Sequence, residues 1–141
     1  MRVYTLHDAQ EYLKRKKNRA LVIDGQEAAS VEAALPLEPL RGGQFILLHA
    51  RAQNNQEALQ LCYAGVRFYC GSELLINRSL VKQGTEPPDA YLGHVQFHGD
   101  GMRTYDLRWI VPFGVDRAEI IFTVHNGAKL TFDELTVEVV D

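Results

Sequence analysis

The chain has 141 residues, of which 46% are hydrophobic and 23% are charged, and its formal net charge is −3. This length and composition are typical of one globular domain with its own core. No apolar run approaches the roughly 20 residues that a membrane-spanning helix needs, so we expect no membrane span.

The charge is unevenly distributed along the chain. Residues 1–19 hold six basic and two acidic side chains, a charge of +4, and the remaining residues carry nine basic and sixteen acidic ones, a charge of −7. Because the larger part of the chain is acidic, we expect no nucleic-acid partner. The basic run at 14–19 is interpreted as the solvated end of a short helix.

Two cysteines and the N-terminal residues give the only indication of a compartment. Cys62 and Cys70 lie in one predicted strand, where eight residues at about 3.3 Å each place them too far apart for a disulfide. Reduced thiols and the absence of an apolar signal region favour a cytoplasmic location, although the sequence leaves the compartment open.

The first predicted element is a helix over residues 7–17, with Asp8 as its N-cap and Ala9, Tyr12 and Leu13 as a thin apolar stripe. We therefore divide the chain into an N-terminal helical segment, residues 1–19, and a β-sandwich domain, residues 20–141. The second part consists of short apolar stretches separated by Gly, Pro, Asn and Asp, a spacing typical of an all-β sandwich or barrel.

Strands are predicted in that second part wherever apolar and polar residues alternate. They cover 19–24, 27–37, 43–53, 58–70, 73–82, 91–98, 103–111, 117–124 and 130–140. Residues 83–90 form a loop, because Pro87-Pro88 cannot continue a strand ladder. The pair Asn126-Gly127 predicts a hairpin, since both residues tolerate positive φ.

Alternation also predicts which side chains share a face of each strand. One face of each is apolar and the other is mixed. The apolar sets are Ile46, Leu48 and Ala50; Val66 and Phe68; Tyr105, Leu107, Trp109 and Val111; and Leu135, Val137 and Val139. Two sheets packed through these faces would bury them, so we expect an antiparallel two-sheet β-sandwich with one short N-terminal helix.

Four segments of the sequence resemble a known pattern. They read "GQFILLHARAQ", "AGVRFYCGSELL", "IVPFGVDRAEIIFTV" and "KLTFDELTVEVV". In this order they resemble the galactose-binding-like β-sandwich (jelly-roll) superfamily, which includes many bacterial carbohydrate-binding modules. The resemblance covers about residues 20–141, and it implies a jelly-roll fold and a non-catalytic binding module.

The adjacent acids Asp133 and Glu134 match the acidic pair in the last strand of that superfamily. The resemblance implies that Asp133 helps to hold a structural calcium, an ion that takes six to eight oxygen ligands. The chain departs from the pattern, because a basic helix replaces the usual N-terminal ligand segment. The alternative is that the pair marks a β-bulge and meets an arginine or backbone donors.

A binding face is the remaining candidate site. Arg51, Arg67, Tyr69, Asp106 and Arg108 lie on the mixed faces of three predicted strands, and His49 and Gln96 could join them. If those strands are neighbours, an aromatic ring beside fixed polar groups suits a sugar. The alternative is an ordinary solvated sheet with cross-strand ion pairs.

No catalytic motif is found. There is no Gly-x-Ser-x-Gly elbow and no glycine-rich phosphate loop, so we expect no enzyme. The first functional hypothesis is a non-catalytic carbohydrate-binding module with a glycan partner. The second is a protein-interaction or self-assembly module, with a partner protein or a homo-oligomer.

Overall fold

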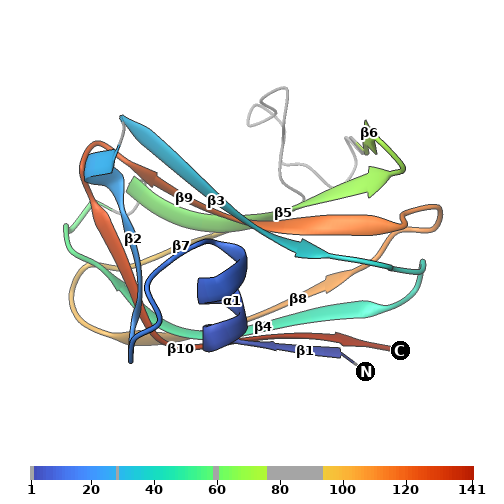
Figure 1. Cartoon of the computed structure of the whole chain (residues 1–141), viewed down its shortest axis with the longest axis horizontal. Coiled ribbons are helices and arrows are strands. Elements are labelled where there is room, and N and C mark those ends of the chain that lie inside the picture. The colour runs from blue at the N-terminus through green and yellow to red at the C-terminus, as the bar shows by residue number, and fades with distance from the viewer. Residues whose placement is uncertain (1, 28, 59–60, 76–93) are drawn as a thin grey trace.

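The computed structural model of the chain describes residues 2–27, 29–58, 61–75 and 94–141. Figure 1 labels its elements along the chain. They are β1 (Arg2–Thr5), α1 (Leu6–Tyr12), β2 (Leu21–Asp24), the 3₁₀ turn η1 (Gly25–Glu27), β3 (Ser30–Leu37), β4 (Phe45–Asn54), β5 (Cys62–Cys70), β6 (Glu73–Leu74), β7 (His94–Gln96), β8 (Arg103–Ile110), β9 (Arg117–His125) and β10 (Lys129–Val140).

The strands form two antiparallel sheets that stack face to face (Figure 1). Sheet A has the order β1-β10-β4-β8, and β2 also pairs with β10. Sheet B has the order β3-β9-β5-β6, and β7 also pairs with β5. The predicted antiparallel two-sheet β-sandwich with one short helix is confirmed.

Most connections between consecutive strands cross from one sheet to the other. The chain passes from β2 in sheet A to β3 in sheet B, back to β4, and then to β5; β8, β9 and β10 alternate in the same way. Asn126 and Gly127 have the expected positive φ values, 53° and 75°. However, they join β9 of sheet B to β10 of sheet A, so the predicted hairpin is wrong.

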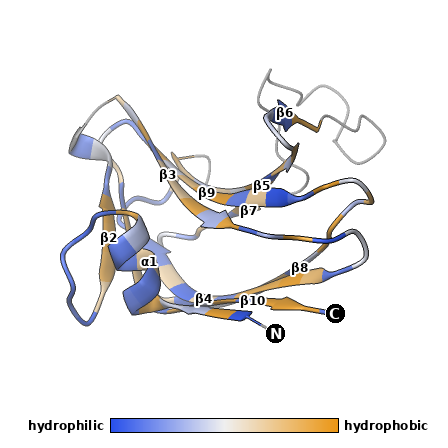
Figure 2. Ribbon diagram, turned by 45° about the vertical axis from the view of Figure 1, so that its right-hand side comes forward, coloured by the Kyte–Doolittle hydropathy of each residue, from blue (hydrophilic) through white to orange (hydrophobic). Residues whose placement is uncertain are grey.

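The predicted apolar faces form the core between the sheets. The sets from β4, β5 and β10 are at most 3% exposed; in the fourth set Trp109 and Val111 are buried, whereas Tyr105 and Leu107 are partly buried against the core. Figure 2 shows hydrophobic residues along the strands of both layers, whereas α1 and the loop after it are mainly hydrophilic. Burial of one face of each strand is therefore the main stabilising contribution, as alternation predicted.

An aromatic cluster joins the two sheets inside this core. Phe132 of β10 meets Phe122 of β9 edge-on, with ring centroids 5.1 Å apart, and also meets Phe97, which follows β7, at 5.5 Å. Phe97 in turn packs against Tyr105 of β8 at 4.9 Å. Edge-to-face pairs of this kind add to the energy of area burial.

The N-terminal residues differ from the prediction in detail. Strand β1, which the sequence did not predict, pairs with β10, and the helix spans Leu6–Tyr12 rather than 7–17. Thr5, not Asp8, is the N-cap, and Asp8 lies at the third helical position of a capping box. The helix ends before Lys14, whose φ of 55° is incompatible with its continuation.

Two predicted features lie partly or wholly outside the described residues. The strand expected at 73–82 is seen as β6, and its residues from 76 onward are outside the description, as is the loop expected at 83–90. The strand expected at 91–98 is seen from His94 to Gln96. In the described part of the chain, no helix has the length and apolar character needed to cross a membrane.

Candidate functional site

The structure places three of the five predicted ligand-binding residues on one face of the sandwich, and two of them, Asp106 and Arg108, line a pocket there. Arg51 of β4 and Asp106 and Arg108 of β8 lie on the outer face of sheet A, because β4 and β8 are direct neighbours. Arg67 and Tyr69 belong to β5 and lie on the outer face of sheet B. The five residues therefore occupy the two opposite faces of the sandwich.

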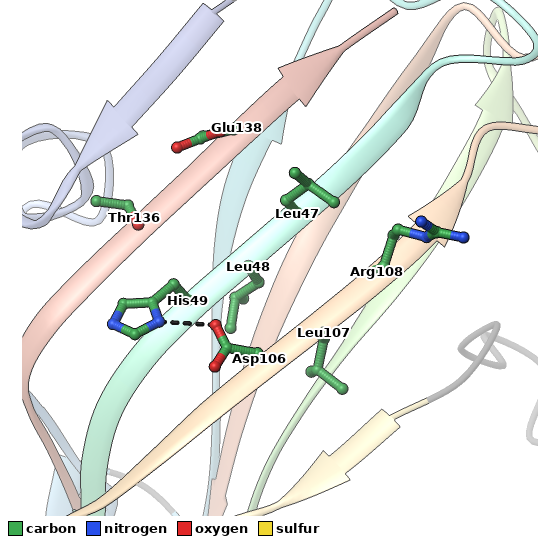
Figure 3. Close-up of a pocket in the computed structure, with 8 residues that line it drawn as sticks. All are labelled: Leu47, Leu48, His49, Asp106, Leu107, Arg108, Thr136 and Glu138. Carbon is green, nitrogen blue, oxygen red and sulfur yellow. Dashed lines mark hydrogen bonds and ion pairs between the residues drawn. The ribbon is translucent and has the colours of Figure 1, made fainter.

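The outer face of sheet A holds an open pocket of about 350 Å³ across the three strands β10, β4 and β8 (Figure 3). It is lined by Leu47, Leu48, His49, Asp106, Leu107, Arg108, Thr136 and Glu138. Strand pairing explains the gathering: Leu47 is opposite both Glu138 and Arg108, and His49 is opposite both Thr136 and Asp106. Outward residues at every second position thus meet in two rows across the pocket.

His49 lies between two carboxylates on the neighbouring strands. Its Nδ1 is 2.7 Å from Asp106 Oδ1 on β8, and its Nε2 is 3.2 Å from Glu134 Oε2 on β10 (Figure 3 shows the Asp106 contact). The hydrogen bond to Asp106, followed by the one to Glu134, raises the pKa of His49 above its ordinary value. An imidazolium that donates from both nitrogens satisfies this geometry best.

A second feature of the same face is the pair formed by Arg108 and Phe45. The Arg108 guanidinium carbon lies 4.7 Å from the centre of the Phe45 ring. Stacking on the Phe45 ring orders the guanidinium. Its N–H groups lie in the plane of the guanidinium and stay available as donors. Along β4, Leu47 lies between Phe45 and His49, and it is paired with Arg108 of β8.

Asp133 lies at a β-bulge, where the register between β10 and β4 shifts between Phe132 and Glu134. Its carboxylate accepts a hydrogen bond from Arg51 Nη1 in an ion pair. This is the bulge-and-arginine alternative that the sequence left open. It also explains how two adjacent acids fit in one strand: the bulge sends Asp133 to Arg51 and Glu134 to His49.

The same observations bear on calcium. Among the described residues, no three His, Cys, Asp or Glu side chains are grouped so that they could hold a metal ion. The Asp133 carboxylate is neutralised by Arg51. These residues do not fit a calcium ion, so the calcium expected at Asp133 stays a prediction without structural support.

On the outer face of sheet B, the other two predicted residues are engaged in cross-strand contacts. Arg67 Nη2 is 2.8 Å from Glu32 Oε2, and the Arg67 side chain is only 11% exposed. The Tyr69 hydroxyl donates to Glu119 at 2.6 Å, and the Arg117 guanidinium carbon lies 3.9 Å from the centre of the Tyr69 ring. Burial, then the bond to Glu119, raises the pKa of Tyr69.

Sequence reasoning did not nominate Glu134, Thr136 or Glu138 for the site. Alternation placed these three on the polar face of the last strand, which was a usable signal. What the sequence lacked was the pairing of β10 with β4, strands that are about 80 positions apart. Local patterns predict which face of a strand a residue occupies, whereas the identity of the neighbouring strands depends on long-range pairing.

The two cysteines are both free, as expected. Cys62 is buried at the start of β5, and burial raises the pKa of its thiol to about 12. A thiol with this pKa is almost wholly protonated near neutral pH, which makes it a poor nucleophile.

Comparisons with known proteins bear on the fold. No protein-family profile and no curated protein matches the sequence. Among solved structures, a family 16 carbohydrate-binding module-2 is similar with a TM-score of 0.53 and 12% identity, over 99% of this chain and 85% of that one. The C-terminal CBM6 of LamC, from Zobellia galactanivorans, gives a TM-score of 0.48 and 11% identity, over 96% and 98%.

A third similar structure is the enzymatically active domain of tailspike protein 4 from bacteriophage CBA120. It has a TM-score of 0.47 and 16% identity, and the match covers 83% of this chain and 17% of the tailspike chain. This chain therefore spans about a sixth of that protein. The similarity to the family 16 module, at 12% identity, shows the fold alone, a β-sandwich of the kind seen in that module, and leaves the ligand undecided.

Proposed function

We propose that this chain is a non-catalytic carbohydrate-binding module whose binding site is the pocket on the outer face of sheet A. The observation that carries the proposal is the pocket itself, in which ordered charged groups surround an apolar patch. Asp106 and Glu138 supply acceptors, Arg108 supplies donors, and Leu47 supplies apolar surface. A sugar needs this combination, because its hydroxyls both donate and accept while its C–H faces are apolar.

The charges of the site favour neutral sugars. Arg51 is paired with Asp133, which leaves Asp106, Glu134 and Glu138 against Arg108 and His49. This set has a charge of −2 when His49 is neutral and −1 when it is protonated. A sulfated or uronic sugar would meet net repulsion, so we expect neutral glycans to bind more tightly.

The geometry also argues against His49 as a general base. His49 is the only histidine lining the pocket, and both of its ring nitrogens already contact carboxylates. A general base needs a free ring nitrogen to accept a proton from the attacking group, and His49 has none. Fixed donors and acceptors instead suit recognition.

The test is a glycan array followed by calorimetric titration of the strongest neutral glycan. We expect His49→Ala and Arg108→Ala to weaken binding at least tenfold, a change of about 1.4 kcal/mol. The matched control is Thr104→Ala, an exposed residue on the same face of β8 outside the pocket. Failure of the wild-type protein to bind any neutral glycan would refute the proposal.

A second candidate function, a self-assembly or protein-interaction module, rests on a different observation. Val3 on β1 and Ile110 on β8 are 45% and 58% exposed. Both strands lie at margins of sheet A, where apolar groups invite a partner. Sedimentation at high concentration tests self-association: a strict monomer contradicts it, and a dimer that Ile110→Lys dissociates supports it.

A further inference from the structure

A second pocket of about 350 Å³ lies at one end of the sandwich. The loop between β3 and β4, the loop between β8 and β9, and the C-terminal end of β10 come together at this end (Figure 1). The lining residues are Arg41, Gly42, Gly43, Gln44, Phe113 and Asp141. The pocket on sheet A does not include any of them.

Phe113 presents its ring to solvent at this end. It is 89% exposed, more than any other large hydrophobic residue in the described part of the chain. Its main chain packs tightly on Gly42, where an added Cβ would lie only 2.5 Å from Phe113 Cα. One edge of the ring also lies against Gly42, with Cδ1 2.6 Å from the added Cβ, while most of the Phe113 side chain stays exposed to solvent.

The polar groups around the ring form an ordered and neutral set. Arg41 Nη2 lies 2.5 Å from Asp141 Oδ1, and Gln44 Nε2 donates to the same oxygen at 3.0 Å. The Gln44 side-chain oxygen in turn accepts from the Arg41 backbone N–H at 2.8 Å. The guanidinium and carboxylate cancel in charge, and the second Asp141 oxygen keeps acceptor capacity.

The first pocket crosses β10, β4 and β8, and the end pocket lies just beyond the ends of the same three strands. The first is centred near Leu48 of β4, and the second begins at Gly43, about five residues earlier, or roughly 16 Å at the rise of a strand. The outer face between them carries Phe45 and exposed Ile110, and Phe45 is in contact with Arg108 of the first pocket. One linear ligand longer than a single sugar ring can therefore contact both.

We propose that the end pocket is a second sugar subsite, in which the Phe113 ring stacks on one pyranose of the neutral oligosaccharide whose other end occupies the sheet A pocket. This inference rests on the proposed function. It makes the substrate class a linear oligosaccharide rather than a monosaccharide. Arg41, Gln44 and Asp141 supply in-plane donors and acceptors to the hydroxyls of the stacked ring.

The experiment measures affinity against chain length. Calorimetric titration uses β-linked glucose and N-acetylglucosamine oligosaccharides, from the monosaccharide to the hexasaccharide, with wild type, Phe113→Ala, Phe113→Tyr and Arg108→Ala. We expect wild-type affinity to rise with length. Phe113→Ala should lower hexasaccharide affinity about tenfold and leave monosaccharide affinity unchanged, whereas Phe113→Tyr keeps the ring and the affinity.

Because Phe113 is exposed, we expect the variants to fold, and a melting curve of each confirms it. Unchanged hexasaccharide affinity in Phe113→Ala, with the loss in Arg108→Ala retained, overturns the subsite and leaves the proposed function intact. No wild-type binding at any length, together with no binding to any neutral glycan of the array, overturns both. Sedimentation in which Phe113→Ala dissociates a dimer, without an effect on glycan affinity, overturns the subsite and assigns the ring to self-association.

Discussion

His49 is the residue whose chemistry depends most on the long-range pairing of strands. The β4 ladder has β10 on one side and β8 on the other, and each neighbour places a carboxylate beside the imidazole. Neither contact is local in sequence, since the partners are 57 and 85 positions away. The protonation state of His49 therefore reports on the assembled face of sheet A.

Protonation of His49 makes the first prediction. The folded-state pKa is raised above the unfolded value of about 6.5, so the extra stability is fully present below pH 6.5 and is lost as pH rises through the folded pKa. NMR titration of the ring protons should show the raised pKa, and Asp106→Asn should lower it. The effect on unfolding free energy should stay below about 1 kcal/mol, because these side chains are 42% and 71% exposed.

Two further variants test this prediction of a raised His49 pKa. Glu134→Gln should lower the His49 pKa as well, but less than Asp106→Asn does, because the Glu134 contact is longer. Thr104→Ala, on the same strand as Asp106, should leave it unchanged. An ordinary pKa for His49 in the wild type would mean that the imidazole does not bridge the two carboxylates in solution.

Single residues also show where sequence reasoning stops. Asp133 was recognised as unusual from its position in the last strand, and both a cation site and a bulge with an arginine partner were consistent with that pattern. The ion pair becomes visible only in the structure, where the register shift between Phe132 and Glu134 brings Asp133 to Arg51. A pattern of residue types identifies a group that needs a partner, but it does not identify the partner.

At the scale of elements, faces were predictable and connections were not. Alternation has a period of two, so each strand defines its buried side on its own, and the sets around Leu48, Phe68 and Val137 are buried as expected. Asn126-Gly127 likewise adopts the conformation that its residues favour. The turn leads to the opposite sheet because that choice depends on which strands pair, and the four turn residues do not encode it.

A close approach between two loops gives the second prediction. Gly99, in the connection between β7 and β8, lies so near the loop after β4 that an added Cβ would be 1.9 Å from the Gln56 carbonyl oxygen. The obstacle is backbone, so it cannot rotate away. We expect Gly99→Ala to reduce the unfolding free energy by about 1–3 kcal/mol in urea denaturation.

The control for Gly99 is Asp100→Ala in the same connection. That substitution removes an exposed ion pair with Arg103, and it should change stability much less. Equal losses in the two variants would show that the two loops separate easily and that the close contact at Gly99 does not constrain the fold.

At the scale of the whole molecule, the sandwich separates two polar faces with a core that shields each from the other. The outer face of sheet A has an open pocket, and its charged groups are largely exposed. The outer face of sheet B has short cross-strand contacts through Arg67 and Tyr69. The five residues of the predicted surface therefore divide into Arg51, Asp106 and Arg108 on sheet A, the face with the proposed binding pocket, and Arg67 and Tyr69 on sheet B.

This division makes the third prediction. Tyr69→Phe removes the hydrogen bond to Glu119 and keeps the ring under Arg117, so it should reduce the unfolding free energy by about 1 kcal/mol while glycan affinity stays unchanged. Arg108→Ala should instead weaken glycan binding and leave the unfolding free energy unchanged. Urea denaturation and calorimetric titration of the same preparations measure both quantities. The reverse result, weaker binding in Tyr69→Phe and normal binding in Arg108→Ala, would place the binding site on sheet B. The core lies between the two outer faces, so a change at Tyr69 has no direct contact through which it could affect Arg108.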